Sequence, residues 1–253
     1  MKITSWNVNG LRAIMKKGFV EWIDDFKPEI VCLQETKLQG DQIPPEINDL
    51  KEYEKYYSFA ERKGYSGVAV FSKKKPDKVE TKLGIERFDN EGRNLIIHYK
   101  EFTLINIYYP NGQMSKERLD YKLAFYDAFL DFANSLLQKG KKLIICGDFN
   151  TAHHEIDLAR PKENENTSGF LPIERAWMDK FVKNGYIDTY RMFVKEAGHY
   201  SWWDYKTRAR ERNIGWRIDY FFVSKNFKDK IQKSFILEDV MGSDHCPVVI
   251  EIS

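Results

Sequence analysis

The stretch Ile144-Ile145-Cys146-Gly147-Asp148-Phe149-Asn150 joins an apolar run to a polar turn. A short apolar run that is closed by a turn signal indicates a buried β-strand, here over Lys142–Cys146. Gly-Asp commonly forms turns and Asn often caps helices, so a purely structural explanation of the turn stays open. A chemical role is the alternative, in which Asp148 orients or deprotonates an attacking water and Asn150 donates a hydrogen bond to an oxygen where charge develops.

Polar side chains also follow or precede apolar runs elsewhere in the chain. The motifs are S-W-N-V-N-G, L-Q-E-T-K, I-Y-Y-P-N-G, W-R-I-D-Y and G-S-D-H-C-P. Their hard oxygen donors, carboxylates and His–Asp pair are groups that metal-assisted phosphodiester hydrolysis requires. If the strands converge at one sheet edge, the motifs meet in a single cleft that contains Asn7, Glu35, Asp148, Asn150, Asp219, Asp244 and His245.

Composition limits the classes of protein that fit the chain. Its 253 residues allow one large domain or two small ones, and 42% are hydrophobic, which is ample for a core. The net charge is only +2, from 40 basic and 38 acidic side chains, so any surface for nucleic acid must be local. No apolar run approaches the ~20 residues that span a bilayer, and the first residues do not form a signal peptide. We therefore expect a cytoplasmic protein without membrane contact.

The three cysteines do not indicate a disulfide framework or a zinc site. Cys32, Cys146 and Cys246 stand in or beside apolar runs, and no Cys-x-x-Cys spacing occurs. Because free cysteine behaves as a small hydrophobic residue, we expect three buried thiols.

Short runs rich in Ile, Val, Tyr and Phe recur along the chain and predict β-strands. In the run Thr103–Ile107, the period of two places the odd-numbered side chains on one face and Leu104 and Asn106 on the other. The predicted strands are Lys2–Val8, Ile30–Gln34, Tyr56–Ala60, Gly67–Ser72, Asn94–Tyr99, Thr103–Tyr109, Lys142–Cys146, Arg217–Val223 and Val248–Ile252.

Helical periodicity is clearest between Lys116 and Lys139. Apolar residues there step by three and four and predict one buried stripe. The stripe contains Leu119, Leu123, Tyr126, Leu130, Ala133 and Leu137. Further helices are predicted over Phe19–Phe26, Pro172–Asn184 and Thr189–Lys195.

The order of the predicted elements favours an α/β fold. The segment 56–109 has strands without intervening helices, which favours antiparallel pairing, whereas strands and helices alternate elsewhere. No low-complexity linker divides the chain. We therefore predict a single domain over residues 1–253, in which two mixed sheets pack face to face and helices cover their outer sides.

Glu35 and His245 each have a structural and a chemical interpretation. Glu35 closes an apolar strand and either anchors a neighbouring loop or binds Mg²⁺, which prefers one or two carboxylates together with water and phosphate. His245 is one of only five histidines and follows Asp244, with Asp219 as a second possible partner. A carboxylate beside a histidine favours the imidazolium form, which would stabilise a phosphate.

Trp202, Trp203 and Trp216 flank a basic segment that leads into Asp219. Three tryptophans so close together would also suit a hydrophobic core. Cations interleaved with aromatic rings are nevertheless typical of nucleic-acid surfaces, where cations bind phosphates and rings pack on sugars or bases. The basic residues are Lys206, Arg208, Arg210, Arg212 and Arg217.

His153 and His154 follow the Asp148 turn and suggest a metal site at first sight. Neighbouring side chains on an extended strand point in opposite directions. We therefore favour a structural or substrate-loop role for this pair.

Taken in order, the motifs closely resemble those of the exonuclease III family of abasic-site endonucleases, within the endonuclease/exonuclease/phosphatase superfamily. The resemblance covers essentially the whole chain and depends on the number and order of the blocks. They are S-W-N-V-N-G-L-R-A, L-Q-E-T-K, G-Y-S-G-V-A, Y-Y-P-N-G, G-D-F-N-T-A-H, E-I-D-L-A-R-P, G-F-L-P-x-E-R, N-I-G-W-R-I-D-Y and G-S-D-H-C-P-V.

The resemblance implies a four-layered α/β sandwich of the deoxyribonuclease I type. It implies Mg²⁺-dependent incision of double-stranded DNA 5′ to an abasic site, which leaves a 3′-hydroxyl, together with 3′→5′ exonuclease and 3′-end-cleaning activities. Mn²⁺ is expected to substitute for Mg²⁺, and the protein is expected to act as a monomer on abasic sites and 3′ ends.

The resemblance also implies a role for each matching residue. Tyr108 resembles the active-site tyrosine, Asp148 the water-activating aspartate, Asn150 the transition-state donor, and Asp219–His245 the phosphate-polarising pair. The metal group comprises Asn7, Glu35, Asp148, Asn150, Asp244 and His245. Trp202, Trp216 and Ile218 match the residues that line the abasic pocket. The other expected DNA contacts are Asn111, Asn164, Ser168, Gly169, Lys206, Arg208 and Arg210.

Two departures from the family pattern concern Asn9 and Trp202. Some members carry an acidic residue in place of Asn9, which leaves a second metal position open, and Phe also occurs in place of Trp202, which leaves the pocket width open.

Two other hypotheses compete. A phosphatase for phosphorylated lipids or inositols would share the catalytic residues but needs extra basic residues in its pocket, and a noncatalytic DNA-binding domain predicts the loss of a chemical residue, whereas all are present.

Overall fold

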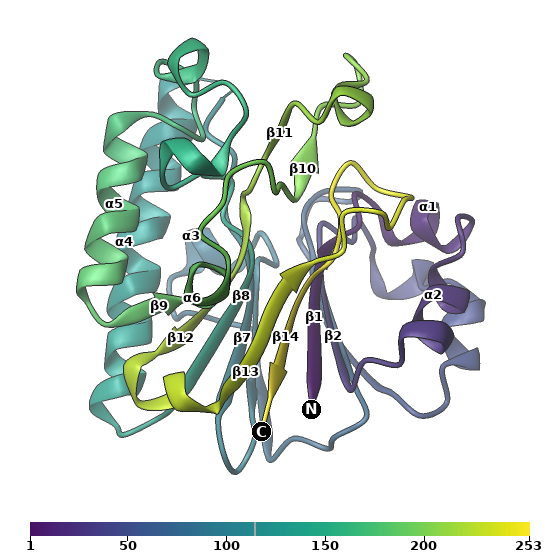
Figure 1. The fold of residues 1–253 in the computed structure, drawn as a ribbon. Helices are drawn as coiled ribbons and strands as arrows, with labels where there is room; N and C mark the ends of the chain where they lie inside the picture. The colour runs from purple at the N-terminus through teal and green to yellow at the C-terminus, as the bar shows by residue number, and fades with distance from the viewer. Residues whose placement is uncertain (114) are drawn as a thin grey trace.

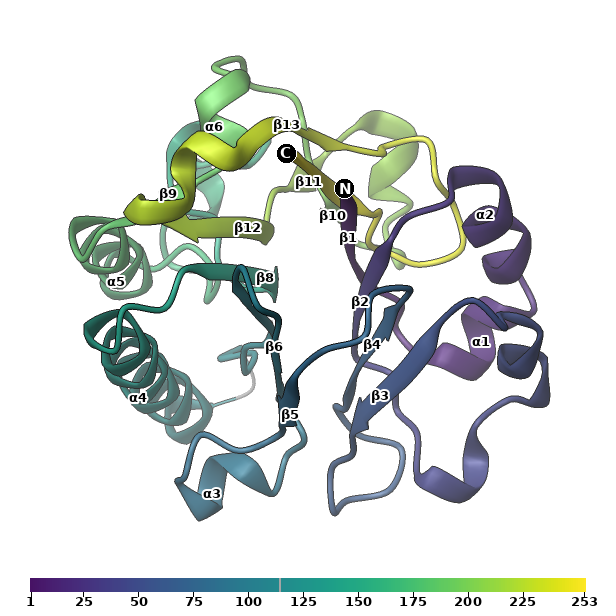
Figure 2. The same cartoon turned by 90° about the horizontal axis from the view of Figure 1, so that it is seen from below.

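The computed structural model describes residues 1–113 and 115–253 and contains two mixed β-sheets that pack face to face (Figures 1 and 2). The first sheet has the strand order β13-β14-β1-β2-β4-β3. Its strands are β1 (Lys2–Asn7), β2 (Ile30–Gln34), β3 (Glu54–Ser58), β4 (Val68–Ser72), β13 (Ile231–Ile236) and β14 (Val248–Ile252).

The second sheet has the order β5-β6-β7-β8-β12-β9. Its strands are β5 (Lys78–Glu80), β6 (Asn94–His98), β7 (Thr103–Tyr108), β8 (Leu143–Asp148), β9 (Tyr186–Asp188) and β12 (Asp219–Ser224). A small antiparallel ribbon of β10 (Trp202–Trp203) and β11 (Gly215–Trp216) stands above one end of the sheets (Figure 1).

Helices cover the outer side of each sheet and complete four layers. The helices α1 (Leu11–Met15) and α2 (Phe19–Phe26) lie against the first sheet, and α4 (Lys116–Gln138) and α5 (Pro172–Lys183) lie against the second (Figure 2). Two more helices are single turns, α3 (Glu86–Asp89) and α6 (Tyr190–Phe193). Short 3₁₀ turns occur at η1 (Gly40–Gln42), η2 (Pro45–Asp49), η3 (Glu155–Asp157), η4 (Lys162–Asn164), η5 (Ala209–Arg212) and η6 (Lys225–Lys230). The predicted four-layered α/β sandwich is therefore confirmed.

The buried side chains of β7 show how one strand serves two layers. Ile105 and Ile107 pack in the cluster between the second sheet and its helices, whereas Leu104 packs between the two sheets. Asn106 shares the inner face with Leu104, and its amide donates hydrogen bonds to the carbonyls of Leu33 and Ala69 in the other sheet, at 3.0 and 2.9 Å. The predicted alternation is confirmed, and the inner polar residue ties the two sheets together.

The helix α4 has the predicted length, but its buried face is rotated from the predicted stripe. Tyr126, Leu130 and Ala133 are buried as expected, whereas Leu119, Leu123 and Leu137 are only partly buried. Leu123 and Leu137 nevertheless pack against the same core cluster, so the prediction is confirmed in part. The buried arc is wider than the predicted stripe because the helix packs on both a sheet and α5. The additional buried residues are Lys122, Phe125, Phe129 and Leu136.

Other element boundaries also depart from the prediction. The strand expected at Tyr56–Ala60 lies at Glu54–Ser58, the helix expected at Thr189–Lys195 is a single turn, and the strand expected from Arg217 begins at Asp219. The strands β5, β9 and β13 were not predicted, because they are short or partly polar edge strands. Within residues 1–113 and 115–253, no helix is long and apolar enough to cross a membrane.

The strand directions bring the polar motifs to one edge of the sandwich. The parallel pair β1 and β2 ends there, as does the parallel pair β7 and β8. The strand β12 runs antiparallel to β8 and therefore begins at this edge, with Asp219 directly opposite Asp148. The strand β14 also begins there, three residues after His245.

Candidate active site

A cleft of about 690 Å³ opens at this edge, between the ends of the two sheets and the β10–β11 ribbon. Most of the predicted site residues face it. Its lining includes Asn9, Glu35, Tyr108, Asn111, Asp148, Asn150, Asn164, Ser168, Gly169, Trp202, Lys206, Trp216, Ile218, Asp244 and His245. Asn7 and Asp219 lie directly behind this surface and are buried.

Asp148 ends β8 in a fixed orientation at the base of the cleft. Its Oδ1 accepts a hydrogen bond from the Asn150 backbone N–H at 2.7 Å, and its Oδ2 accepts one from Asn7 Nδ2 at 2.9 Å. The preceding Gly147 is required for this turn, because its φ is 141° and a Cβ atom there would lie 1.8 Å from the Ile107 carbonyl oxygen. The carboxylate is therefore held by the turn that follows β8 and by β1 of the other sheet.

Asn150 sits beside Asp148 with a left-handed backbone, φ 50°. Its amide Nδ2 donates to the Tyr109 carbonyl at 2.9 Å, and its Oδ1 accepts from Asn111 Nδ2 at 3.3 Å. Asparagine tolerates positive φ better than most residues, so this conformation places a neutral amide next to the carboxylate at little cost.

His245 and Asp219 form a buried pair that also contains Ser201. His245 Nδ1 lies 2.8 Å from Asp219 Oδ2, and Ser201 Oγ donates to the same oxygen at 2.6 Å. Ser201 Oγ in turn accepts hydrogen bonds from the backbone N–H groups of Ile218 and Asp219. His245 Nε2 then points toward Asp148, with 3.9 Å between Nε2 and Asp148 Oδ2.

The close approach of these three residues determines their protonation. Burial alone would lower the pKa of His245, but the charge of Asp219, the hydrogen bond to it and the charge of Asp148 together raise that pKa to about 10. Burial and the negative charge of Asp219 raise the pKa of Asp148 to about 7, against the opposing effect of His245. At neutral pH the cluster therefore combines an imidazolium with a carboxylate poised to accept a proton.

Glu35 faces the cleft from the end of β2. Its φ of 55° is unusual for a glutamate, and backbone hydrogen bonds from Gly10 and Leu11 to the carbonyls of Glu35 and Thr36 maintain the turn. Asn7 Nδ2 donates to Glu35 Oε2 at 3.1 Å as well as to Asp148, so Asn7 connects the two carboxylates. Lys37 lies 3.0 Å from Glu35 Oε1.

The donor set at this end of the cleft fits a hard divalent cation. Carboxylate and amide oxygens converge from both sheets, and Asp148, Asp219 and His245 offer ligand atoms within 4.8 Å of one another. Within the part of the chain that the structure describes, the buried Asp219 Oδ1 has no hydrogen-bond partner. Such concentrated oxygen donors are typical of Mg²⁺ sites that keep positions open for water and phosphate.

Tyr108 presents a neutral hydroxyl to the cleft. Removal from water raises its pKa, and the negative charges of Glu35 and Asp148 raise it further, so the phenol keeps its proton and can donate a hydrogen bond. Arg93 supports the tyrosine from behind, since its guanidinium donates to the Tyr108 carbonyl at 3.0 Å and lies 4.8 Å from the centre of the Tyr108 ring.

Asp244 connects the site to the β10–β11 ribbon. Its Oδ1 accepts from Asn9 Nδ2 at 3.0 Å, and its Oδ2 accepts from Trp202 Nε1 at 3.2 Å. The backbone reinforces this contact, because the Trp203 N–H donates to the Asp244 carbonyl at 3.0 Å. The ribbon is therefore fixed directly above the cluster of Asp148, Asp219 and His245.

Trp202, Trp216 and Ile218 form an apolar wall beside the cluster. Trp202 and Trp216 are paired across the ribbon, and their rings meet edge to face at 6.3 Å. Gly169 closes this wall, because a Cβ atom at its position would lie 3.2 Å from the Trp216 ring. Trp203, by contrast, is buried in a separate core cluster. The core interpretation thus applies to Trp203, while the other two tryptophans line the cleft.

The basic segment does not form the continuous cationic surface that its sequence suggested. Lys206 lines the cleft, whereas Arg208 and Arg210 do not. The Arg210 guanidinium donates to the carbonyls of Glu238 and Val240, at 2.5 and 2.8 Å, and packs on Trp203. Arg217 is fully buried and pairs with Asp157 at 2.8 Å. These contacts give Arg210 and Arg217 internal partners, so neither side chain contributes to a cationic surface in the cleft.

The loop that contains Asn164 and Ser168 lies on the rim of the cleft. Asn164 Nδ2 donates to the Arg160 carbonyl at 2.8 Å, and Ser168 Oγ donates to Glu174 at 2.9 Å. Asn111 is exposed on the same side and bonded to Asn150. These residues face the solvent-filled cleft from the side of the second sheet.

Several residues around the site were not singled out from the sequence. Ser201 contacts Asp219, Lys37 contacts Glu35, Arg93 supports Tyr108, and Arg160 lines the rim. Ser201 and Arg93 lie 18 and 15 residues from their partners, so no local pattern could reveal these contacts. The adjacency of Lys37 to Glu35 in L-Q-E-T-K was the one available signal.

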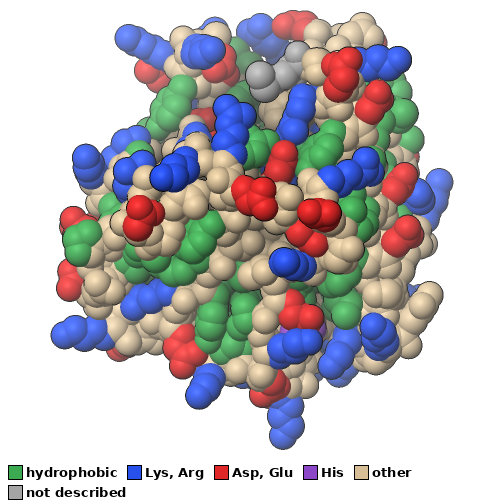
Figure 3. Space-filling view, turned by 180° about the vertical axis from the view of Figure 1, so that it is seen from behind, with side chains coloured by type: hydrophobic (Ala, Val, Ile, Leu, Met, Phe, Trp, Pro, Cys, Tyr) green, Lys and Arg blue, Asp and Glu red, His purple; other side chains and the backbone are tan. Residues whose placement is uncertain are grey.

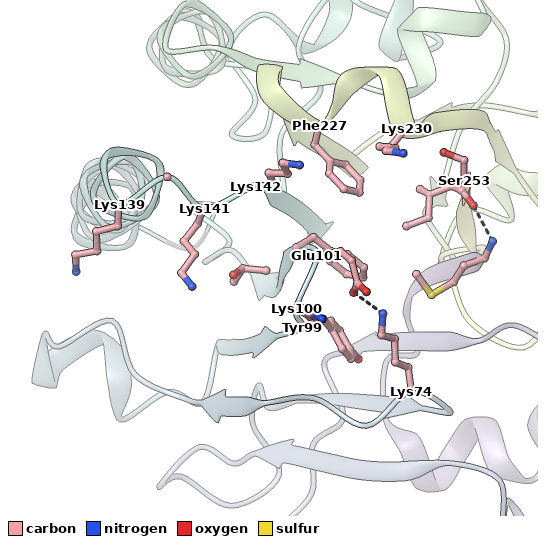
Figure 4. A pocket seen from close by; sticks show the side chains of 15 residues that line it. Lys74, Tyr99, Lys100, Glu101, Lys139, Lys141, Lys142, Phe227, Lys230 and Ser253 are labelled. Carbon is pink, nitrogen blue, oxygen red and sulfur yellow. Dashed lines mark hydrogen bonds and ion pairs between the residues drawn. The ribbon is translucent and has the colours of Figure 1, made fainter.

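A second large cavity, of about 640 Å³, lies at the opposite end of the sheets near both chain termini (Figure 4). Its rim is rich in lysines that come from different loops, and Lys74 pairs with Glu101 at 2.5 Å. The lysines are Lys74, Lys100, Lys139, Lys141, Lys142 and Lys230. Its described lining includes neither the His–Asp pair nor the carboxylates that converge in the cleft.

Charge is mixed on the side of the molecule opposite to the view of Figure 1. On the face seen in Figure 3, Lys and Arg side chains alternate with Asp and Glu side chains. This agrees with 40 basic and 38 acidic residues in the chain.

The fold and the cleft define a hydrolase of the metal-dependent phosphoesterase class. The profile of the Endonuclease/Exonuclease/phosphatase family matches residues 4–245, and the chain belongs to that family. It is 45% identical to an exodeoxyribonuclease of Bacillus subtilis, with both chains covered in full. It is 41% identical to a DNA-(apurinic or apyrimidinic site) endonuclease of Dictyostelium discoideum, over the whole of this chain and 70% of the relative. A 3′-5′ exonuclease structure from Neisseria meningitidis superposes with a TM-score of 0.92 at 28% identity, with both chains covered in full.

Proposed function

We propose that the protein is a DNA-repair nuclease that hydrolyses the phosphodiester 5′ to an abasic site and leaves a 3′-hydroxyl. We further propose that the same site removes nucleotides and blocking groups from 3′ ends. The observation that carries this proposal is the position of the Asp148–Asp219–His245 cluster directly beneath the apolar wall of Trp202, Trp216 and Ile218. A phosphate at the cluster would place the adjoining sugar against that wall.

The roles of the side chains follow from their protonation and position. Asp148 accepts the proton of the attacking water, since it is buried, oriented and poised near neutral pH. The water oxygen attacks phosphorus, and the bond from phosphorus to the 3′ oxygen breaks. The cationic His245, held by Asp219, stabilises the negative charge that develops on the phosphoryl oxygens, and Asn150 donates a hydrogen bond to the same group.

The leaving 3′ oxygen needs a proton or a compensating charge. Tyr108 carries a protonated hydroxyl on the cleft side and can donate to a substrate oxygen. Its support by Arg93 limits its movement, which favours a positioned donor over a mobile one.

We propose Mg²⁺ as the cofactor, with Mn²⁺ as a substitute, held mainly by Glu35 and Asn7 and completed by Asp148, Asn150 or Asp244; His245, which is cationic and paired with Asp219, is left out of the ligand set expected from the resemblance. The oxygen donors of this group and the acidic surroundings fit a hard cation better than a thiolate-seeking or imidazole-seeking one. When bound, the cation supplies positive charge that polarises the phosphate and assists departure of the 3′ oxygen.

Selectivity for abasic sites is proposed to come from size. A deoxyribose without a base can enter a pocket walled by two tryptophans, whereas a complete nucleotide would overlap with the rings. Flipping a nucleotide out of the duplex also costs the least free energy where base pairing is already absent. The distal ends of the cleft, with Asn111, Asn164, Ser168, Gly169 and Lys206, are proposed to contact the flanking backbone.

A phosphatase for phosphorylated inositols or lipids is the competing function. Such a substrate carries several phosphates and requires several cations around one pocket. Among the described residues, Arg160 and Lys206 are the Lys and Arg side chains that line the cleft, and acidic Glu163 and Asp204 accompany them.

The experiment that tests the proposal is a cleavage assay on matched labelled duplexes that are intact, abasic, recessed at a 3′ end, 3′-phosphorylated or deoxyuridine-containing. Each duplex is incubated with Mg²⁺ and with EDTA, and an inositol polyphosphate is assayed in parallel. We expect EDTA-sensitive incision of the abasic duplex with a 3′-hydroxyl product. Phosphate release from the inositol substrate without DNA incision would replace the proposal with the phosphatase function. The product distribution over the five duplexes then gives the balance of the activities.

A further inference from the structure

A cluster of two histidines and one aspartate lies outside the cleft, on the outer side of the second sheet. His153 and His154 follow the catalytic turn by three and four residues, and Asp179 comes from α5. The three side chains offer ligand atoms that all lie within 4.8 Å of one another. The proposed DNA chemistry uses none of these atoms.

The two imidazoles do not point in opposite directions, as an extended strand would require. Their rings stack with 3.7 Å between centroids and an angle of 24° between planes. The segment is not a strand, since the first turn of η3 begins directly after His154. The structural argument against a metal site, which depended on strand geometry, is therefore wrong for this pair.

The cluster is held in place by backbone contacts on one side and is open on the other. The His153 N–H donates to the Tyr220 hydroxyl at 3.1 Å, and the His153 carbonyl accepts from Arg175 Nε at 3.1 Å. His153 is buried, whereas His154 and Asp179 are exposed. His153 Nε2 lies 2.8 Å from Asp179 Oδ1. An ion can therefore enter from solvent and meet ligands whose backbone does not need to move.

The donor set selects a different class of metal from the cleft. Two imidazole nitrogens with one carboxylate oxygen suit Zn²⁺, Ni²⁺ or Cu²⁺, whereas Mg²⁺ prefers oxygen donors. Three protein ligands leave at least one position for water. Because a metal ion lies in the plane of each imidazole that binds it, binding requires the His154 ring to rotate out of the stack, and the exposed His154 and Asp179 side chains are free to turn toward an ion.

We propose that His153, His154 and Asp179 form a second metal site, of the transition-metal class, with Zn²⁺ as its ligand. A bound ion would join α5 to the segment that follows Asp148 and Asn150, because His153 and His154 belong to that segment and Asp179 belongs to the helix. It would stabilise the folded chain, since the unfolded chain does not assemble the three ligands.

The test measures Zn²⁺ binding by equilibrium dialysis, with tag-free protein and an excess of Mg²⁺ that occupies oxygen-rich sites. The visible spectrum of Co²⁺, used as a substitute, reports ligand geometry. Two variants each replace one metal ligand with a side chain of similar size that does not bind the ion. His154→Phe preserves the ring stack, and Asp179→Asn preserves the size of the side chain. We expect each variant to weaken Zn²⁺ binding by at least about tenfold, as lost metal contacts do, and to alter the Co²⁺ spectrum.

His199→Phe is the matched control, because His199 also pairs with a carboxylate, Glu238 at 2.9 Å, but belongs to no group of three ligands among the described residues. We expect it to bind Zn²⁺ as the wild type does. Thermal unfolding provides an independent readout: Zn²⁺ should raise the midpoint of the wild type and of His199→Phe, but not that of His154→Phe. Equal Zn²⁺ affinity in all four proteins, or complete displacement of Zn²⁺ by Mg²⁺, would overturn the proposal.

Discussion

Lys122 Nζ lies 2.6 Å from Glu174 Oε1, and neither side chain has any exposed surface. Lys122 also donates to the Asn150 carbonyl at 2.7 Å and to Thr151 Oγ1 at 2.9 Å. Glu174 accepts from the Gly169 N–H at 2.6 Å. One buried ion pair thus connects α4 and α5 with the turn that contains Asn150 and Thr151 and with the loop that contains Gly169.

We predict that Lys122→Met destabilises the fold and lowers turnover. The substitution leaves Glu174 as an unpaired buried carboxylate, and breaking such a pair costs about 3–5 kcal/mol. Urea unfolding of Lys122→Met, Glu174→Gln and the double variant measures this cost. The double variant should recover part of the loss, because no buried charge remains. If the losses of the single variants simply add, the two residues do not act as a pair.

We predict that Asp148→Asn preserves folding and abasic-DNA binding but abolishes most turnover. The amide keeps the shape of the carboxylate but cannot accept the proton of water. Loss of one transition-state donor typically costs ~10²–10³ in rate, and loss of the activating carboxylate should cost at least as much. Single-turnover cleavage and a binding titration on the same duplex measure the two quantities. Near-normal cleavage by the variant would remove Asp148 from the mechanism.

The prediction for Asp219 and His245 concerns pH. Activity requires His245 to be cationic, so it should fall as pH rises through about 10, the pKa that Asp219 maintains. Activity also requires an ionised Asp148, so it should fall as pH drops through about 7. Asp219→Asn removes the neighbouring anion and should therefore move the alkaline limit to lower pH.

Single-turnover rates of Asp219→Asn, His245→Gln and the double variant provide the second readout for this pair. Residues that act as one unit show rate losses far from additive. Additive losses, together with an alkaline limit that stays in place in Asp219→Asn, would show that the two residues act separately.

We predict that Glu35→Ala raises the Mg²⁺ concentration needed for half-maximal cleavage. A methyl group cannot replace an anionic oxygen ligand, and Glu35 faces the cleft between Asn7 and Lys37. Lys37→Met is the matched control, since it removes the competing cation and should leave the requirement unchanged or lower it. A Glu35→Ala titration curve that superimposes on the wild-type curve would place the cation elsewhere.

The sequence predicted the meeting of distant motifs because each motif marked the end of a strand. The prediction was conditional on the strands converging at one edge, and the structure meets that condition: β1 and β2 end there in one sheet, and β7 and β8 end there in the other, with Asp219 opposite Asp148. The partners behind the site could not be predicted in this way. Ser201 reaches Asp219 through the ribbon, and no pattern in either segment reports the contact.

The basic segment predicted the DNA-facing side chains less well than the strand ends predicted the cluster, because the charge of a side chain does not indicate which way the side chain points. Lys206 and Arg210 stand four residues apart in one basic segment, yet Lys206 lines the cleft and Arg210 binds carbonyl oxygens behind it. Lys122 is buried on α4 because it pairs with Glu174, which is distant in sequence. Such ion pairs are decided by tertiary structure and not by local pattern.

The last prediction concerns what separates an abasic-site enzyme from a general nuclease. Trp216 forms part of the apolar wall, and it contacts Trp202 across the ribbon and lies against Gly169. Trp216→Ala should widen the pocket, weaken the fit of an abasic sugar and admit complete nucleotides. The ratio of abasic to intact cleavage should therefore fall, by about tenfold or more for the loss of so large a side chain. Competition between the two duplexes in one reaction measures this ratio directly.

Lys206→Met is the comparison for Trp216→Ala, because Lys206 lines the same cleft but carries only charge. A phosphate contact positions DNA without reading the site, so its loss should weaken binding to both duplexes and flatten the salt dependence while the ratio stays constant. Arg208 lies outside the cleft lining, so Arg208→Met should weaken DNA binding less than Lys206→Met does. If Trp216→Ala lowers both activities in equal proportion, or if the variant unfolds in urea far earlier than the wild type, Trp216 supports the fold and selectivity resides elsewhere in the cleft.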